Sequence, residues 1–444
     1  MTATRPELRI NGSLAWRDGV DATSELWSQI VTSSHPPDNA AANGRAPEAG
    51  FRVVALYLPQ FHPIPENDVW WGPGFTEWTN VARARPLFRG HFQPNLPGEL
   101  GFYDLRLPET RAVQAALAQT YGVEAFCYWH YWFGGERLLE RPFAEVLASG
   151  EPGLSFCLAW ANQSWTGIWH GAPHRMLKEQ TYPGQEDVEA HFHAVAPALH
   201  DSRSFRVDGR PLFGIFRPTE LPDAQRFIET WRRLADREGL PGIYFVGFTD
   251  DPAWRPADDG YDAAVLFGFS GGAQSIRRGT GAKVTKRLKR LSLNLGDSAR
   301  TLLGHPLVFD YEEVRPERIF GTSLRSDIHP CVVPNWDNTP RSGRNGRVLF
   351  GATPEAFRGQ LEVAARLVSD RPHDSRLLFI KSWNEWAEGN YLEPDQRFGR
   401  GWLEAVADVQ VDAGVETFGR KGVAVASGRY SAPAELGRTR PDRS

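Results

Sequence analysis

Short apolar runs alternate with segments of helical periodicity along most of this chain. Eight apolar runs predict strands, at residues 53–61, 125–132, 155–162, 211–218, 244–250, 263–269, 331–338 and 377–386. Apolar residues at helical spacing predict helices at residues 109–119, 186–199, 223–238, 354–368 and 402–411. Several of the strands are apolar throughout, as expected for a sheet that is covered on both faces. The pattern indicates an α/β protein with a parallel sheet.

Eight strands with helices between most of them are the count of a (β/α)8 TIM barrel. The 444 residues suit one barrel of about 250 residues with insertions. An open doubly wound sheet is the alternative, but no glycine fingerprint follows any predicted strand. We expect the barrel at residues 51–417. A flexible extension would precede it at 1–50, where 33–50 are rich in Pro, Ala, Asn and Gly, and a flexible tail would follow at 418–444.

Composition argues for a cytoplasmic protein that needs no cofactor. The start, MTATRP, lacks the apolar core of a signal peptide, and no run of 18 apolar residues occurs. The formal charge of −4 gives no overall attraction to nucleic acid or membrane. Cys127, Cys157 and Cys331 all fall in apolar runs, which predicts reduced core thiols and no metal site.

A basic insertion is expected after the sixth strand, at about residues 271–330. Between 277 and 290 it holds seven basic residues and no acid: Arg277, Arg278, Lys283, Lys286, Arg287, Lys289 and Arg290. One interpretation is a solvated helix face. The other is a patch for anionic lipid headgroups or a diphosphate-bearing donor, which would place the protein at the membrane periphery.

Polar and aromatic residues cluster at the ends of five predicted strands. They include Gln60, His62, His130, Tyr131, Trp132, Trp160, Asn162, Asn335, Trp336, Asn384 and Glu385. Active-site residues of a TIM barrel gather at the carboxyl ends of its strands. These positions are therefore candidates for substrate contacts.

The run 383–391, WNEWAEGNY, places Glu385 and Glu388 three residues apart among indole rings. Chemistry at the anomeric carbon of a sugar needs an acid to protonate the leaving oxygen and a second group that supplies charge or a base. Aromatic rings stack on the C–H faces of pyranoses. A solvated Glu pair in a turn is the structural alternative, and the crowding of Trp, Asn and Gly favours a sugar site.

Several long motifs resemble the WbsX proteins, bacterial proteins linked to surface polysaccharide whose domain is similar to glycoside hydrolase family 99. Residues 57–68 read YLPQFHPIPEND, 74–81 read GFTEWTNV, 126–133 read FCYWHYWF and 383–395 read WNEWAEGNYLEPD. The resemblance spans roughly residues 53–409.

Family 99 enzymes are (β/α)8 barrels that cleave internal α-mannosidic bonds with retention. The resemblance implies that Glu385 deprotonates the 2-hydroxyl of the sugar, and that Glu388 protonates the leaving oxygen and then activates the acceptor. The substrate-binding candidates, from this motif set and the strand ends, are Tyr57, Gln60, His62, Trp71, Glu77, Trp78, His130, Tyr131, Trp132, Trp160, Asn162, Trp165, Asn335, Trp336, Asn384, Trp386 and Tyr391.

One loop departs from the WbsX pattern. Where these proteins usually read Trp-Ala-Asn-Glu-Asn-Trp, residues 160–165 read WANQSW, so that neutral Gln163 replaces a carboxylate. His170 stands at an Asp position of the pattern. The catalytic pair is kept, and substrate contacts in this loop should differ.

Three functions remain open. The first is a retaining glycosidase or transglycosidase acting on α-linked, manno-like sugars, with a glycan or a lipid-linked oligosaccharide as substrate. The second is a glycosyltransferase of lipopolysaccharide or O-antigen assembly, although no Rossmann fingerprint or DxD cluster for a metal-bound diphosphate is evident. The third, a non-catalytic glycan-binding module, is disfavoured by the intact pair of Glu385 and Glu388.

Overall fold

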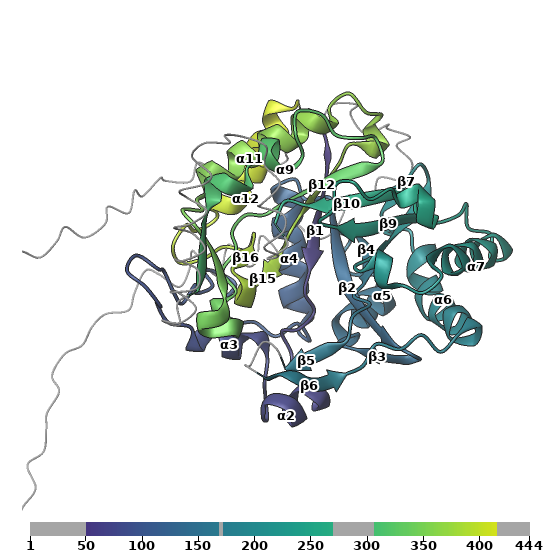
Figure 1. Ribbon diagram of the computed structural model, residues 1–444, viewed down its shortest axis with the longest axis horizontal. Helices are drawn as coiled ribbons and strands as arrows, with labels where there is room; N and C mark the ends of the chain where they lie inside the picture. Colours follow the sequence, from purple (N-terminus) through teal and green to yellow (C-terminus); the bar gives the residue numbers. More distant parts are fainter. Residues whose placement is uncertain (1–49, 168–171, 270–305, 415–444) are drawn as a thin grey trace, which may run out of the picture.

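The computed structural model describes residues 50–167, 172–269 and 306–414, and its centre is a closed barrel of eight parallel strands (Figure 1). The strands follow the order β1, β14, β12, β10, β9, β8, β4, β2, and β2 pairs again with β1. Their bounds are β1 (Arg52–Tyr57), β2 (Ala125–Phe133), β4 (Ser155–Trp160), β8 (Arg210–Ile215), β9 (Tyr244–Thr249), β10 (Ala263–Phe267), β12 (Ile328–Val332) and β14 (Leu377–Ile380). The predicted (β/α)8 barrel is confirmed.

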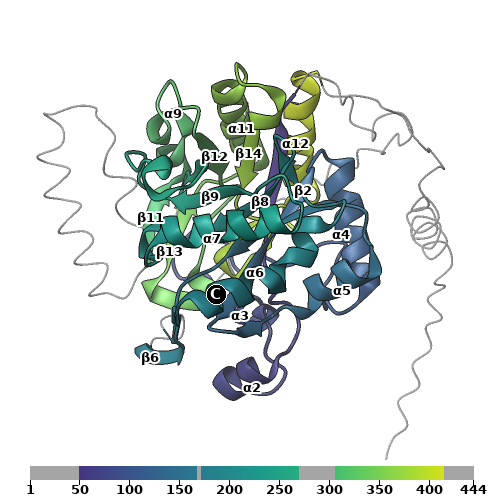
Figure 2. The same cartoon turned by 90° about the vertical axis from the view of Figure 1, so that its right-hand side faces the viewer.

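Helices cover the outside of the barrel. They are α4 (Pro108–Thr120), α5 (Arg141–Ser149), α6 (Gln185–His200), α7 (Ala224–Arg237), α11 (Pro354–Val368) and α12 (Gly401–Asp412). All of these except α5 were predicted. Figure 2 looks onto α6 and α7, which lie side by side. Between β9 and β10 the connection carries a 3-10 turn, Pro256–Asp259, in place of a helix.

Strand alternation divides the buried residues into two cores. Residues that alternate along the strands, such as Val54 and Leu56 of β1 or Cys127 of β2, fill the barrel interior. Their neighbours, such as Phe126 and Tyr128, face the helices. Burying side chains of this size stabilises a fold by about 1.5–3 kcal/mol each. The residue parity along a strand therefore decides whether a side chain faces the barrel axis or the helices.

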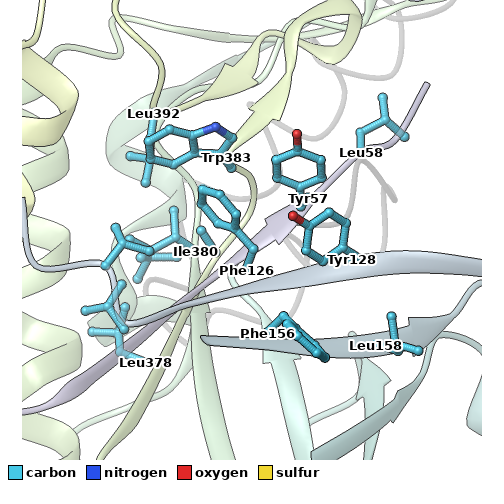
Figure 3. Packing of buried hydrophobic residues seen from close by; sticks show 14 of the residues in the cluster. Tyr57, Leu58, Phe126, Tyr128, Phe156, Leu158, Leu378, Ile380, Trp383 and Leu392 are labelled. Atoms are coloured by element: carbon cyan, nitrogen blue, oxygen red, sulfur yellow. The ribbon is translucent and has the colours of Figure 1, made fainter. Parts of the chain in front are cut away.

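Figure 3 shows part of the outer core, where rings from three segments meet. The ring centroid of Phe126 lies 4.9 Å from that of Tyr57 and 4.8 Å from that of Trp383. The ring centroids of Tyr128 and Tyr57 lie 4.4 Å apart. These contacts fix the start of the 383–391 run against β1 and β2.

Additional short elements surround the carboxyl ends of the strands. They are α2 (Pro65–Trp71) and α3 (Glu77–Arg83) after β1, β3 (Glu136–Leu138) after β2, the antiparallel pair β5 (Trp165–Gly167) and β6 (Ala172–Lys178) after β4, α10 (Thr339–Ser342) after β12, and the hairpin β15 (Asn384–Glu385) with β16 (Asn390–Tyr391) after β14. At other places lie β7 (Arg206–Val207), α9 (Pro316–Ile319) and the parallel pair β11 (Leu307–Asp310) and β13 (Arg347–Phe350).

The predicted strand limits differ from the observed ones mainly at the carboxyl ends. The seventh strand ends at Val332 and the eighth at Ile380, so the polar residues expected at their tips lie in the loops that follow. Cys127, Cys157 and Cys331 are buried and unpaired, as expected. Residues 1–49, the basic run 277–290 and the tail 418–444 lie outside the described residues. Within the described ranges, each helix is too short or too polar to cross a membrane.

Candidate active site

A cavity of about 860 Å³ lies at the carboxyl ends of the barrel strands, the end that carries the active sites of TIM-barrel enzymes. Its wall comes from β2 itself and from segments after β1, β4, β8, β12 and β14. Glu385 and Glu388 both line this cavity, and Glu77 of α3 joins them. The two carboxylates of the 383–391 run thus face one space, as the sequence predicted for them.

The hairpin β15–β16 is held rigidly against the barrel. Asn384 is fully buried and bonds the backbone of Leu58 twice, with Oδ1 accepting from N at 2.8 Å and Nδ2 donating to O at 3.0 Å. Gly389 has a φ of +67°, and a Cβ there would lie 2.7 Å from the backbone nitrogen of Asp337. That nitrogen donates to the carbonyl oxygen of Glu388 at 2.7 Å, so glycine permits the approach that fixes Glu388.

Arg341 of α10 is the centre of a buried ion cluster. Its Nε donates to Glu77 Oε2 at 3.0 Å, Nη1 to Glu388 Oε1 at 2.8 Å and Nη2 to Glu385 Oε1 at 2.5 Å. The Arg341 side chain is 9 % exposed, and the three carboxylates are 4–10 % exposed. Because Glu385 and Glu388 contact one guanidinium, their carboxyl groups lie within the span of about 10 Å that paired carboxylates of glycosidases occupy.

The environment of the cluster changes how Glu385 titrates. Burial raises the pKa of Glu385 to about 7, the charge of Arg341 opposes this rise, and the carboxylates of Glu388 and Glu77 add to it. Burial alone would lower the pKa of Arg341, but its three carboxylate partners hold that pKa well above the usual value. Near neutral pH, Glu385 can therefore take up or release a proton while Arg341 remains charged.

A fourth carboxylate, Asp337, fixes the turn that carries Arg341. Asp337 Oδ1 accepts from the backbone nitrogen and the hydroxyl of Thr339, at 3.0 and 2.6 Å. Its Oδ2 lies 2.7 Å from His91 Nε2 and accepts from Gln93 Nε2 at 2.6 Å. The first turn of α10 is thereby tied to the segment before α4, and Arg341 projects from a fixed base.

Glu393 supports the hairpin from behind. It is fully buried and accepts hydrogen bonds from Tyr103 Oη at 2.8 Å, Gln114 Nε2 at 2.6 Å and Trp386 Nε1 at 2.6 Å. Burial raises the pKa of Glu393 to about 7, although these donors oppose the rise. Glu393 thus links Gln114 of α4 to the indole of Trp386, a residue that lies between Glu385 and Glu388 in the sequence.

Aromatic rings form much of the cavity wall: Trp71, Phe75, Trp129, Tyr131, Trp165, Phe216 and Trp336. Trp165 meets Tyr131 edge to face, with ring centroids 5.0 Å apart, and meets Trp70 at 5.7 Å. Flat apolar faces next to carboxylates and amides suit the C–H faces and hydroxyls of a saccharide.

Eight of the residues predicted for the site line the cavity: Gln60, Trp71, Glu77, Tyr131, Trp165, Trp336, Glu385 and Glu388. The first and last of them, Gln60 and Glu388, are 328 residues apart in the sequence, and the closed barrel brings all eight together.

The expectation that His130 and Trp132 wall the cavity is wrong. His130 Nε2 lies 3.0 Å from His191 Nε2, and the Trp132 ring stacks on His191 with centroids 4.8 Å apart. Trp132 Nε1 donates to Asp187 Oδ1 at 3.0 Å, and both partners belong to α6. Alternation along β2 turns even-numbered residues to the helices, so that Tyr131 faces the cavity and its two neighbours do not.

The same alternation, along β1 and β4, turns Tyr57 and Trp160 away from the cavity. Tyr57 Oη donates to Gln114 Oε1 of α4 at 2.7 Å, and buried Trp160 donates to the carbonyl oxygen of Trp132 at 3.2 Å. Asn162 also lies behind the wall, where it bonds the backbone nitrogen and oxygen of Arg217 at 2.7 and 2.9 Å. These residues position the loops instead of lining the cavity.

The remaining predicted residues outside the cavity are His62, Trp78, Asn335, Asn384, Trp386 and Tyr391. Trp386 and Tyr391 stack at 3.8 Å within the hairpin, and Trp78 Nε1 donates to the carbonyl oxygen of Tyr103 at 2.8 Å. Burial lowers the pKa of His62 to about 4, so His62 is neutral near pH 7. Asn335 is half-buried beside the cavity-lining Trp336.

Sequence reasoning missed Arg341, Arg347, Lys381, Trp129 and Phe216 as cavity residues. Trp129, Phe216 and Lys381 have the inward parity of β2, β8 and β14, so strand alternation would have found them. Arg341 and Arg347 lie in the connection after β12, where no periodic pattern indicates which side chain turns inward. Among the residues that the structure describes, no group of three His, Cys, Asp or Glu side chains is arranged to hold a metal ion.

Comparison with known proteins places this site in a family context. The family model described as "Glycosyltransferase WbsX" matches residues 53–406, which include every cavity residue. Two proteins from Xanthomonas campestris pv. campestris, each described as "Uncharacterized protein WxcX", are 40 % (strain B100) and 42 % (strain ATCC 33913) identical over 357 residues. These alignments cover 80 % of this chain and 48 % of each relative, so the chain spans about half the length of the curated relatives it matches.

Among solved structures, the GH99 endo-alpha-mannosidase from Bacteroides thetaiotaomicron aligns with a TM-score of 0.48 at 15 % identity. That alignment covers 82 % of this chain and 97 % of the other. A structure described as "Glycoside hydrolase-like protein" aligns with the same TM-score at 14 % identity, over 84 % of this chain and 97 % of that one.

Proposed function

The chain belongs to the family described as glycosyltransferase WbsX, and on this basis we propose that it is a carbohydrate-active enzyme of bacterial surface-polysaccharide metabolism. Its substrate would be an α-linked, manno-like glycan, free or lipid-linked, and the reaction would proceed with retention. The observation that carries the proposal is the buried pair of Glu385 and Glu388 on one guanidinium, in a cavity walled by aromatic rings.

The first step uses the 2-hydroxyl of the sugar as an internal nucleophile. Glu385 accepts the 2-hydroxyl proton, and the 2-oxygen attacks the anomeric carbon from the face opposite the leaving group. The bond from the anomeric carbon to the leaving oxygen breaks while Glu388 donates its proton to that oxygen. The product of this step is a 1,2-anhydro sugar, and Glu385 now carries the proton.

The second step reverses the proton transfers. A water or an acceptor hydroxyl attacks the anomeric carbon from the original side and gives its proton to Glu388, while the 1,2-anhydro ring opens. The 2-oxygen regains a proton from Glu385, so both carboxyl groups return to their starting states. Two inversions at one carbon give net retention.

The electrostatics of the cluster support the role of Glu385 as the base. A general base works best when its pKa lies near the working pH, and the pKa of Glu385 is raised to about 7 by burial. Arg341 contacts Glu385 through Oε1, and its charge favours the ionised form of Glu385 that accepts the proton. Substrate hydroxyls entering between the carboxylates would share or replace these contacts with Arg341.

Of the two possible reactions, the family description favours transfer to an acceptor hydroxyl over hydrolysis. The same carboxylates serve both outcomes, because Glu388 activates whichever hydroxyl reaches the anomeric carbon. A non-catalytic binding module would need no pair of buried carboxylates on one guanidinium.

The test compares Glu388→Gln and Glu385→Gln on two α-mannoside substrates, one with a poor leaving group and one whose leaving group needs no proton. Glu388→Gln should lower turnover of the first by about 10² to 10⁴ and spare the second. Glu385→Gln should lower turnover of both, because the 2-hydroxyl must still lose its proton. Small and equal losses in both variants on both substrates would reject the proposed roles. Mass spectrometry of the products, with and without an acceptor sugar, separates transfer from hydrolysis.

A further inference from the structure

Four cationic side chains line the cavity, and they differ in how they are paired: Arg217, Arg341, Arg347 and Lys381. Arg341 is saturated by the three carboxylates of its cluster. The Arg217 Nε lies 3.9 Å from Glu220 Oε1 on an exposed part of the wall. For Arg347 and Lys381, the described residues provide no carboxylate within ion-pair distance. A cation that is largely removed from water normally has such a partner.

Lys381 directly follows β14, at a position that alternation turns to the same side as the interior residues Leu377 and Phe379, and it is only 8 % exposed. Its ammonium lies 4.5 Å from the ring centroid of Trp336 and 4.8 Å from that of Phe267. Two ring faces attract a cation and hold it in place, but they do not neutralise its charge. The ammonium therefore retains its positive field at the cavity surface.

Arg347 is the first residue of β13 and is tied to the same part of the wall. Its backbone nitrogen donates to Asn338 Oδ1 at 2.7 Å, and its carbonyl oxygen accepts from the Asn338 nitrogen at 3.2 Å. Two residues further on, the nitrogen of Leu349 donates to the carbonyl oxygen of Trp336 at 2.7 Å. Arg347 and Lys381 thus both adjoin the segment Trp336–Asn338. Burial lowers the pKa of the half-buried Arg347 with no opposing contribution from an acid.

We propose that Trp336, Arg347 and Lys381 form a subsite, here called the cationic subsite, for an oxyanion carried by the glycan. The oxyanion would be a carboxylate, as in a uronic acid, or a phosphate ester. A guanidinium offers two parallel donors to either group, an ammonium offers a compact charge, and the indole offers a face for the sugar ring. The inference rests on the proposed function, because it takes the occupant of the cavity to be a saccharide.

A purely internal role for Lys381 is the competing explanation. Its charge lowers the pKa of Glu385, although it contributes less to that pKa than burial, Arg341, Glu388 and Glu77. A residue that only tunes Glu385 would not discriminate between charged and neutral ligands, and Arg347, which acts on no acid of the cluster, would have no function in that account. Charge-selective binding therefore separates the two explanations.

The experiment is calorimetric titration of the full chain with mannose, mannuronic acid, mannose 6-phosphate and inorganic phosphate. The wild type should bind at least one of the charged sugars about tenfold or more tightly than mannose at low salt, since hydrogen bonds to charged groups are the stronger ones. The advantage should shrink as salt is added. Lys381→Met, which keeps the stem between the two rings, and Arg347→Gln should each lose most of this preference while still binding mannose. Arg318→Gln, an exposed charge removal on α9, is the matched control and should behave as wild type.

The probes also separate the sources of the oxyanion. Preference for mannuronic acid assigns a uronic acid, and preference for mannose 6-phosphate assigns a phosphate ester. Equal affinity for charged sugars and mannose, or a preference unchanged in both variants, would overturn the inference. So would binding of inorganic phosphate as tightly as mannose 6-phosphate, because no sugar would then be recognised. Charge-selective binding without turnover of any glycan would support the subsite and count against the proposed function. Turnover of neutral glycans without charge-selective binding would support the proposed function and count against the cationic subsite.

Discussion

At the scale of single residues, the site depends on how one cation organises three anions. Glu77, Glu385 and Glu388 would repel one another in a buried cavity, and Arg341 makes their proximity tolerable by contacting all three. The sequence indicated Glu385 and Glu388 because they sit in one run rich in Trp and Asn, and it indicated Glu77 through the 74–81 motif of the family resemblance. It did not indicate Arg341, which precedes Glu385 by 44 residues in a turn without periodicity.

Removing the charge of Arg341 should shift the pH dependence of activity. In Arg341→Met, the pKa of Glu385 should rise further above 7, because the charge that opposes the effect of burial is lost. Glu385 acts in its ionised form, so the acid limb of kcat/KM should move to higher pH by about one unit or more. The measurement is a pH profile of kcat/KM for wild type, Arg341→Met and Arg341→Lys. The Lys variant keeps the charge and should shift less; an acid limb that stays in place or moves to lower pH would contradict the prediction.

At the scale of elements, the sequence showed where the strands lie, but it did not show directly which residues of a strand face the barrel interior. The eight strands were predicted because their apolar runs reflect burial on both faces, and burial is a property of composition. The cavity residues on β2 required one further step, since a run of aromatic residues does not show which face is inside. Trp129 and Tyr131 face inward because they share the parity of Cys127, which lies in the barrel interior. Arg341 and Arg347, by contrast, are positioned by long-range contacts that local pattern does not encode.

The opposite parities of Trp129 and Trp132 predict opposite effects of the same substitution. Trp129→Leu removes a cavity ring and should reduce kcat/KM on a glycan by about tenfold, the scale of one aromatic contact. Trp132→Leu removes the stacking on His191 and the bond to Asp187, so it should lower the unfolding midpoint and leave kcat/KM of the folded protein nearly unchanged. Enzyme kinetics and urea unfolding on both variants provide the check. A larger kinetic loss for Trp132→Leu would mean that the parity assignment does not govern function.

Glu393 ties the hairpin to α4 and should make stability depend on pH. Its pKa is about 7 in the folded protein, above the value of 4.5 that is usual for Glu, so folding favours its protonated form. The stability from this group is fully present below about pH 4.5 and is lost as the pH rises through 7. Relative to Glu393→Gln, the wild type should therefore lose stability between pH 4.5 and 7. Urea unfolding of both proteins across this range tests the sign; a difference that is constant, or that grows in favour of the wild type at higher pH, would contradict it.

At the scale of the whole molecule, closure of the barrel is what creates the site. Strand β1 pairs with both β14 and β2, which closes the ring, so that β2 and the loops after β1, β12 and β14 border one cavity. All cavity residues lie between Leu58 and Glu388, inside the family match of 53–406. Although the alignments cover only 48 % of each matched relative, the groups assigned to the reaction belong to a single closed unit.

This closure predicts that the barrel alone performs the reaction. A chain limited to residues 50–414 keeps every strand of the barrel, the ion cluster on Arg341 and all residues that line the cavity. It should therefore fold and retain kcat/KM on a small α-mannoside within about twofold of the full chain, because the groups assigned to the reaction, Glu385 and Glu388, and the Arg341 that contacts them all lie within 50–414. Circular dichroism establishes that the shortened chain is folded, and the same chain with Glu388→Gln provides the inactive control. If the shortened chain folds but loses its activity on small substrates, then groups outside 50–414 take part in the reaction. If activity falls only on lipid-linked or polymeric substrates, the removed segments serve in recruiting the substrate, and the assignment of the chemistry to the barrel stands.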